Sequence, residues 1–249
     1  MKVWVCSLLS VGLVSVISLI GLVTLSVGPS ILRKTLLYLV SFAVGALFGD
    51  ACIHLIPETF ERVRPPLTGS LLLIGGILIF FVLEKFVRWR HCHVPEEDHQ
   101  HVHPVVTMNI VGNGVHNMID GMLIGASYTA SVPIGVATTI AIILHEIPQE
   151  IGNFSILVHG GLPVKRALLL NFMTAMAAFL GAVVTLVVGS HAEMFTLYLL
   201  PITAGGFLYI AGSDLIPELH HEVDARTSLG QLASIIMGVG IMAVLKFIE

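Results

Sequence analysis

The stretch VPIGVATTIAIILHEIPQEIGNFSILV, residues 132–158, is long and apolar enough to cross a lipid bilayer as one helix. A bilayer core about 30 Å thick needs roughly 20 apolar residues in a helix. His145, Glu146 and Glu150 lie in the middle of this stretch. An ionisable side chain inside a membrane costs about 2.5–3.5 kcal/mol even on the lenient insertion scale, so such residues usually have a function. The stretch therefore predicts a membrane-spanning helix with functional polar groups at its centre.

Further apolar runs on both sides of this stretch bring the number of predicted membrane helices to eight. They cover residues 3–27, 35–57, 67–87, 104–128, 132–158, 163–189, 194–218 and 228–248. The run 3–27 is longer than the roughly 7–15 apolar residues of a signal peptide, so we interpret it as the first helix. The chain is thus predicted to be an all-α integral membrane protein with one transmembrane domain over residues 1–249.

Composition supports this class and excludes several others. Apolar types make up 55% of the 249 residues and charged types only 11%, whereas soluble domains average about 25% charged. The net charge of -4 and the absence of a continuous basic patch argue against nucleic acid as a partner. The cysteines at 6, 52 and 92 are too few and too scattered for a disulfide framework. The lipid bilayer is the partner that this composition predicts.

The basic residues predict the direction of each helix. Positive charge stays on the cytoplasmic side of a membrane. Both termini are therefore expected on the non-cytoplasmic side, in a cell membrane (plasma or inner), with residues 88–103 as a His-rich cytoplasmic loop. Eight of the 12 basic residues lie at the first, third, fifth and seventh connections, namely Arg33, Lys34, Lys85, Arg88, Arg90, Lys165, Arg166 and Arg226.

Two helices of this predicted topology share a short motif. Asp50 is followed by Leu-Ile-Pro-Glu at 55–58, and Asp214 is followed by the same four residues at 215–218. The two helices are predicted to run in opposite directions, which is the pattern that an inverted repeat leaves in a transporter sequence. Four matching residues can also arise by chance, so the pattern alone leaves both interpretations open.

The helices 104–128 and 132–158 carry the residues suited to metal chemistry. His116 and Asp120 are four residues apart, as are His145 and Gln149, so each pair lies on one helical face. The connection between the two helices is short, so they form a hairpin that brings both motifs to a similar depth. Imidazole and carboxylate ligands together suit zinc and its neighbours rather than calcium. The predicted metal ligands are His116, Asn117, Asp120, His145, Glu146, Gln149 and Glu150.

Other interpretations of these residues remain open at this stage. The run His145–Gln149 nearly matches the His-Glu-x-x-His helix of zinc proteases, but it has Gln149 in place of the second histidine and Pro148 inside the motif. A passive metal-selective channel would use similar ligands. Gln149 could also serve only as a hydrogen-bond partner of Asn117. We favour transport over an enzymatic function.

The motifs HNMIDG (116–121) and HEIPQEIGNF (145–154), together with eight helices and a His-rich third loop, resemble the ZIP (Zrt-, Irt-like protein) family of divalent metal transporters. The resemblance is closest to the branch whose fifth helix reads HExPHExGD. It implies a 3+2+3 arrangement, in which helices 1–3 and 6–8 form an inverted repeat around helices 4 and 5. It also implies inward transport by alternating access.

The same resemblance implies a binuclear metal site at mid-membrane. His116, Asp120, His145 and Gln149 would build one position, and Asn117, Glu146 and again Asp120 the adjacent one. The sequence departs from the family pattern at three positions. Gln149 stands where relatives have histidine or glutamate, and Asn153 stands where they have aspartate. Ala178 stands where some branches have glutamate. Zn²⁺ is the expected substrate, with Fe²⁺, Mn²⁺ and Cd²⁺ as alternatives, and no cofactor is expected. The oligomeric state is left open, with a homodimer as one option.

Two further groups of polar residues are predicted to contact the metal less directly. The first would line the pathway: Asp50, His54, Glu58, His159, Asp214 and Glu218. The second lies in the His-rich loop and would bind metal in an exchangeable way: His91, Cys92, His93, His99, His101 and His103. The alternatives are interfacial solvation of helix ends for the first group and a hydrophilic linker for the second.

Overall fold

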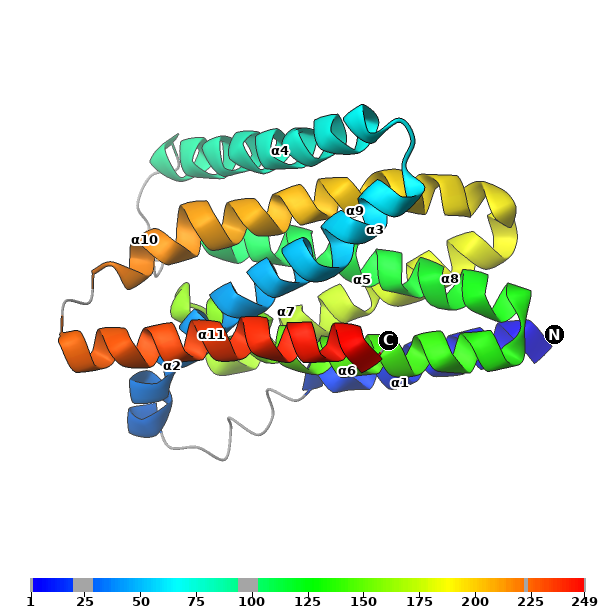
Figure 1. Cartoon of the computed structure of the whole chain (residues 1–249). Coiled ribbons are helices and arrows are strands. Elements are labelled where there is room, and N and C mark those ends of the chain that lie inside the picture. Colours follow the sequence, from blue (N-terminus) through cyan, green and yellow to red (C-terminus); the bar gives the residue numbers. More distant parts are fainter. Residues whose placement is uncertain (1, 20–28, 94–102, 222–223, 249) are drawn as a thin grey trace.

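The computed structural model describes residues 2–19, 29–93, 103–221 and 224–248. Within these ranges every regular element is helical, and the long helices lie side by side with similar axis directions (Figure 1). The elements are α1 (Lys2–Ile17), α2 (Pro29–Gly49), η2 (Asp50–Leu55), α3 (Ile56–Arg62), α4 (Pro66–His93), α5 (Pro104–Ala130), α6 (Val132–His159), α7 (Val164–Ala175), α8 (Ala177–Val188), α9 (Ser190–Tyr209), η3 (Ile210–Leu215), α10 (Ile216–Leu219) and α11 (Ala225–Ile248).

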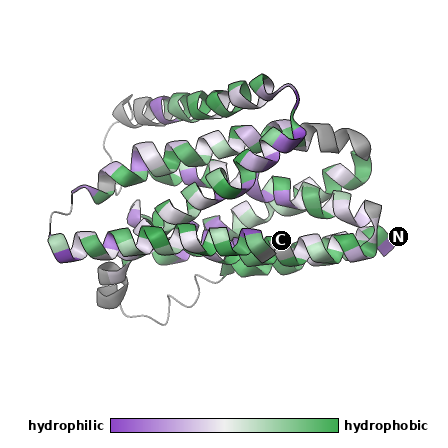
Figure 2. Cartoon of the chain, viewed as in Figure 1, coloured by the Kyte–Doolittle hydropathy of each residue, from purple (hydrophilic) through white to green (hydrophobic). Residues whose placement is uncertain are grey.

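Each of the eight predicted membrane helices corresponds to a helical stretch of the structure. Six are long and apolar enough to span a membrane: Thr35–Arg62, Pro66–Phe86, Val132–His159, Val164–Val188, Thr196–Leu215 and Ala225–Phe247. The described part of the first helix, α1, is shorter. The 27-residue α5 is long enough but carries the polar motif residues. Figure 2 shows apolar residues along most of the length of the described helices.

Burial is distributed as expected for a protein that has lipid as its solvent. Large apolar side chains on α4 and α8, such as Leu71, Val82 and Val187, are more than half exposed. Polar side chains at the centre of the bundle, such as Asn113 and His116, are almost fully buried. A soluble protein would rarely expose so much contiguous apolar surface, so the described residues form an all-α membrane protein.

The second and seventh predicted helices extend differently from the sequence-based prediction. The second was predicted to end near Pro57, but it continues through the π-helical segment η2 and through α3 to Arg62. Proline lacks the N–H that an interior helical position needs, and here Pro57 falls in the first turn after the π-helical segment, where that N–H is least needed. The seventh helix repeats this pattern, with η3 followed directly by Ile216 and Pro217.

The sixth predicted helix, 163–189, is divided in the structure. Helix α7 ends at Ala175 and α8 begins at Ala177, with Met176 between them. Helix α8 then packs closely against α5, because two glycines bring the backbones together. A Cβ added to Gly121 would lie 1.9 Å from the carbonyl oxygen of Ala178, and one added to Gly181 would lie 1.9 Å from that of Met118. Small residues allow this approach between membrane helices.

The hairpin of α5 and α6 positions the two metal motifs. Helix α5 ends at Ala130 and α6 starts at Val132, so Ser131 is the whole connection. The Ser131 hydroxyl caps α6 by accepting a hydrogen bond from the Ile134 N–H at 3.3 Å. A turn this short makes the helices antiparallel neighbours, so residues at similar distances from Ser131 lie at the same depth.

Candidate metal centre

Four side chains from the α5–α6 hairpin gather at its centre. His116 and Asp120 come from α5, and His145 and Glu146 come from α6. One potential ligand atom from each lies within 4.8 Å of the others. Only His145 among them is more than slightly exposed, so the group is enclosed within the bundle. We call these four residues the central cluster.

Short contacts between histidine and carboxylate run within and between the two helices. His116 Nε2 lies 3.4 Å from Asp120 Oδ2 on its own helix and 3.4 Å from Glu146 Oε1 on α6. His145 Nε2 lies 3.6 Å from Asp120 Oδ2, and the two imidazole rings have centroids 5.8 Å apart. The four groups therefore converge on one small volume rather than each facing a different neighbour.

Electrostatics explains why a cation suits this volume. Asp120 Oδ2 and Glu146 Oε1 are buried, and the imidazole nitrogens that lie 3.4–3.6 Å from them carry a positive charge only when protonated. Burying a carboxylate without a compensating positive charge is expensive. A divalent ion provides the missing positive charge, and neutral imidazole nitrogens provide further ligands that suit a borderline metal such as zinc.

The segment η2 borders the central cluster on one side. Asp50 Oδ1 lies 3.4 Å from His54 Nδ1, and Asp50 Oδ2 lies 3.8 Å from His116 Nδ1. The ring of His54 lies 6.3 Å from that of His145. These two residues were predicted to line the pathway, and the structure brings them directly beside the cluster.

Gln149 contacts η2 rather than α5. Its side-chain amide donates a hydrogen bond to Asp50 Oδ2 at 3.2 Å, while Asn117 donates instead to the carbonyl and the side-chain oxygens of Asn113. The alternative of a Gln149–Asn117 hydrogen bond is therefore wrong. The carbonyl oxygen Oε1 of Gln149 is buried and has no hydrogen bond, so it is available to a cation.

Glu150 lies outside the central cluster as the structure has it. Its carboxylate accepts a hydrogen bond from the side-chain amide of Asn171 on α7. Asn171 was not among the predicted site residues, although a lone asparagine in the apolar run 163–189 was a signal that could have indicated it. Asn113 donates to Thr174 of the same helix at 3.0 Å, so α7 contributes polar side chains beside the motif helices.

The other predicted residues that the structure describes do not belong to the central cluster. Glu58 forms an ion pair of 3.1 Å with Arg62 near the end of α3. His159 is the last residue of α6, and Asp214 is buried in η3. His103 caps α5, since its Nδ1 accepts a hydrogen bond from the Val105 N–H at 3.2 Å. The side chains of Glu218, His91, Cys92 and His93, and the whole of His99 and His101, lie outside the described residues.

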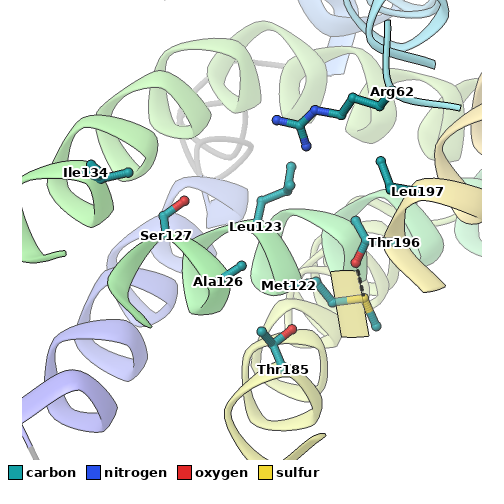
Figure 3. Close-up of a pocket in the computed structure, with 9 residues that line it drawn as sticks. All are labelled: Arg62, Met122, Leu123, Ala126, Ser127, Ile134, Thr185, Thr196 and Leu197. Carbon is teal, nitrogen blue, oxygen red and sulfur yellow. Dashed lines mark hydrogen bonds between the residues drawn. The ribbon is translucent and has the colours of Figure 1, made fainter. Parts of the chain in front are cut away.

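A cavity of about 560 Å³ opens beyond the cluster, at the end of the bundle where α5 turns into α6 (Figure 3). Among the described residues that line it, Arg62 alone is charged. Met122 lies two positions beyond Asp120 on α5, and its sulfur accepts a hydrogen bond of 3.1 Å from the Thr196 hydroxyl. The cavity thus reaches the hairpin close to the metal motif from the end opposite the beginning of α5.

Comparison with known proteins identifies the family. The model of the family described as ZIP Zinc transporter matches residues 1–105 and 90–246, which together span nearly the whole chain. The chain belongs to the ZIP zinc transporter family. The central cluster therefore lies in a membrane transporter, and this family consists of transporters rather than enzymes.

Relatives within the ZIP family align over most of their length. The chain is 35% identical to zinc transporter ZIP13 of Pongo abelii over 260 residues, covering 96% of this chain and 77% of the relative. It is 30% identical to ZIP13 of Danio rerio over 306 residues, covering 99% and 88%. It is also 31% identical to zinc transporter zipt-7.1 of Caenorhabditis briggsae over 278 residues, covering 85% and 71%.

Proposed function

We propose that this ZIP family chain carries zinc across a membrane into the cytoplasm through the central cluster. The observation that supports this most directly is the convergence of His116, Asp120, His145 and Glu146 within 4.8 Å at the centre of the hairpin. Zinc–ligand distances of about 2.0–2.2 Å require only small side-chain adjustments from this arrangement. Zinc is the substrate, and Fe²⁺, Mn²⁺ and Cd²⁺ are the competing ions to test.

The ligand set of this proposal differs slightly from the one implied by family resemblance. Glu146 joins the two histidines and Asp120 around one metal position, since its Oε1 lies 3.4 Å from His116 Nε2. Gln149, held by Asp50, offers its free carbonyl oxygen at the edge of that position. The motif HEIPQE keeps the first histidine, both glutamates and the proline of the HExPHExGD branch, to which we assign the chain.

An inverted repeat is the second part of the proposal. It is supported by the π-helical segments η2 and η3, each of which is followed by Ile-Pro-Glu. Helices α3 and α10, which follow these segments, end at opposite ends of the bundle (Figure 1). The neighbours also correspond, because α2 packs against α11 while α9 packs against α4. The positive-inside rule supports non-cytoplasmic termini, and the resemblance to the family supports transport directed inward.

The experiment that tests the proposed function is zinc uptake by the purified protein in liposomes. Wild type should take up radioactive zinc in a saturable way, whereas His145→Ala should show only the leak of empty liposomes. The matched control is Leu180→Ala on α8, whose side chain is more than half exposed on the surface of the bundle. Equal saturable uptake by the wild type and the His145 variant, at equal protein content, would refute the proposal.

A further inference from the structure

We infer that Asp50 is a positioning residue for the central cluster: its carboxylate on η2 orients two metal-binding side chains of the α5–α6 hairpin. Asp50 acts without touching the metal, by holding the imidazole of His116 and the amide of Gln149 in the orientation that zinc needs. This role rests on the proposed function, since it takes the central cluster as the zinc site.

The carboxylate of Asp50 is buried and faces three polar side chains. Its Oδ1 lies 3.4 Å from His54 Nδ1 within η2. Its Oδ2 accepts a hydrogen bond of 3.2 Å from the side-chain amide of Gln149 and lies 3.8 Å from His116 Nδ1. His116 belongs to α5 and Gln149 to α6, so one oxygen of η2 meets both helices of the hairpin.

The imidazole of His116 presents its two nitrogens to different carboxylates. Its Nε2 lies 3.4 Å from Asp120 Oδ2 and 3.4 Å from Glu146 Oε1, whereas its Nδ1 lies 3.8 Å from Asp50 Oδ2. The two nitrogens of an imidazole point in divergent directions, so an ion bound by Nε2 between Asp120 and Glu146 lies on the side away from Asp50. Asp50 accordingly does not belong to the four residues whose ligand atoms lie within 4.8 Å of one another.

The second nitrogen of a metal-binding histidine needs a partner of its own. When Nε2 binds a metal, Nδ1 carries a proton, and this N–H almost always donates to a carboxylate, a carbonyl or water. His116 Nδ1 is buried and has no hydrogen bond in the described structure, and the Asp50 carboxylate faces it. A movement of about 1 Å brings the pair to the usual hydrogen-bond distance, and such bonds commonly tighten when the ligand binds.

The same carboxylate fixes which end of the Gln149 amide faces Asp50. The NH₂ group donates to Asp50 Oδ2, so the carbonyl oxygen Oε1, on the other branch of the amide, is directed away from Asp50. That oxygen is buried and has no hydrogen bond. An ionised carboxylate can only accept hydrogen bonds, so it excludes the flipped amide, whose NH₂ group would face a cation. Asp50 thus selects the orientation in which Gln149 offers an oxygen ligand.

Both effects depend on the position of η2, because Asp50 belongs to a different helix from the two residues that it orients. The preceding helix α2 packs against α6, where a Cβ added to Gly152 would lie 3.0 Å from the Cβ of Ala43. This close packing holds η2 beside the hairpin. The zinc affinity of the central cluster is therefore coupled to the contact between η2 and the hairpin, and loss of that contact would favour release.

Zinc titration of the full-length protein in lipid nanodiscs tests the role of Asp50. Asp50→Ala removes the acceptor of both side chains and should weaken zinc binding by about 10- to 100-fold. Asp50→Asn keeps the shape but loses the charge and one acceptor oxygen, so it should weaken binding by about tenfold. The matched control is Cys52→Ser in the same π-helical segment, whose side chain is exposed; it should bind zinc as the wild type does. Wild-type affinity in Asp50→Asn would overturn the inference.

Nuclear magnetic resonance of isotope-labelled protein separates positioning from direct ligation. In the zinc-loaded wild type, His116 should bind zinc through Nε2 and carry its proton on Nδ1; its signals are assigned through backbone correlations to Asn117. The Nδ1 proton should move to lower frequency in Asp50→Ala, because it loses a charged acceptor. Zinc bound through Nδ1 in the wild type, or an unchanged Nδ1 proton in Asp50→Ala, would contradict the role of Asp50.

A double-mutant cycle tests the action of Asp50 through Gln149. Asp50→Asn should reduce zinc affinity by a smaller factor in a Gln149→Ala background than in the wild type, because no amide remains to be oriented. Equal factors would overturn the inference. The expected losses in the Asp50 variants, together with no zinc uptake by the wild type, would refute the proposed function alone. Saturable uptake together with wild-type affinity in Asp50→Asn would refute the role of Asp50 alone.

Discussion

His145 Nε2 on α6 lies 3.6 Å from Asp120 Oδ2 on α5, and this contact joins the two halves of the metal motif across the hairpin. The same carboxylate oxygen is 3.4 Å from His116 Nε2. The Asp120 carboxylate therefore lies within 3.6 Å of a nitrogen of each of the two imidazoles. Its removal should affect metal binding more than the loss of any ligand at the edge of the cluster.

Asp120→Ala is expected to abolish saturable zinc uptake, because it removes the charge that both histidines share and leaves Glu146 as the only anion of the cluster. Asp120→Asn keeps the shape but loses the charge, so it should weaken zinc binding by at least about tenfold. Isothermal titration of zinc into the purified protein measures the binding, and liposome uptake measures the transport. Wild-type affinity in both variants would exclude Asp120 as a ligand.

Gln149 is expected to tune which metal is carried. Gln149→His adds a nitrogen ligand, so it should tighten zinc binding and lower the relative uptake of Mn²⁺ and Fe²⁺. Gln149→Glu should shift the preference toward Mn²⁺, since a carboxylate suits harder ions. Competition among zinc, iron and manganese in the uptake assay compares the three proteins.

The hydrogen bond from Gln149 to Asp50 adds a structural consequence to that comparison. Gln149→Glu replaces the amide donor by a second carboxylate facing Asp50, so this variant should be less stable without metal and should recover stability when Mn²⁺ is added. Identical selectivity profiles for all three proteins would show that Gln149 does not touch the metal.

Gly121→Ala should destabilise the protein by separating α5 from α8. Its Cβ would lie 1.9 Å from the Ala178 carbonyl oxygen, and overpacking of this kind typically costs about 1–3 kcal/mol. Gly114→Ala is the matched control on the same helix, because nothing lies within 4 Å of the added Cβ. Thermal unfolding in detergent should show a lower midpoint for the first variant only. Equal midpoints would mean that the two helices can move apart without loss.

Tyr209→Phe should lower the stability of the protein, because it removes a hydrogen bond between α9 and α4. The Tyr209 hydroxyl donates a hydrogen bond of 2.6 Å to Oε2 of the buried Glu84, and loss of a hydrogen bond to a carboxylate costs about 1.5–3 kcal/mol. Tyr198→Phe on the same helix is the control, since that side chain is largely exposed. If the Tyr209 variant were as stable as the Tyr198 variant, the hydrogen bond between Tyr209 and Glu84 would not contribute to stability.

Substitution of His91, His93, His99 and His101 by serine should leave zinc binding at the central cluster unchanged while altering the rate or regulation of uptake. His103 is left out of this variant because it caps α5 and its N–H bonds to Gly160. The measurement is the uptake rate at several zinc concentrations, together with zinc stoichiometry. Loss of tightly bound zinc from the core in the serine variant would contradict a peripheral role for the loop.

Much of the fold was predictable because its determinants are local. Apolar runs long enough to cross a bilayer gave the helices, and a connection of one residue at Ser131 forces α5 and α6 into a hairpin. The i, i+4 spacing of His116 and Asp120 then placed both on one face. Family resemblance strengthened the same conclusion, and the family match supports it.

The rest depends on contacts between helices that no local pattern encodes. Sequence spacing could not tell that Gln149 bonds to Asp50, because the two lie on helices that are distant in the chain. Asn171 was missed for a similar reason, since a single asparagine in an apolar run has no partner until α7 packs against α6. The extension of the second helix past Pro57 was missed because proline usually marks a helix end, and the π-helical segment changes that rule.

The two π-helical segments also determine in which direction the side chains of the following helices, α3 and α10, point. A π-helical turn corresponds to one residue inserted into an α-helix, and one residue turns a helix by about 100°. Deleting a single residue between Asp50 and Leu55 would restore regular α-helical winding and would shorten the helix by only about 1.5 Å. It would, however, turn Arg62 away from the cavity that it lines and separate the Glu58 end of the helix from its present neighbours. The extra residue in each π-helical segment thus sets the direction in which the side chains of the rest of that helix point.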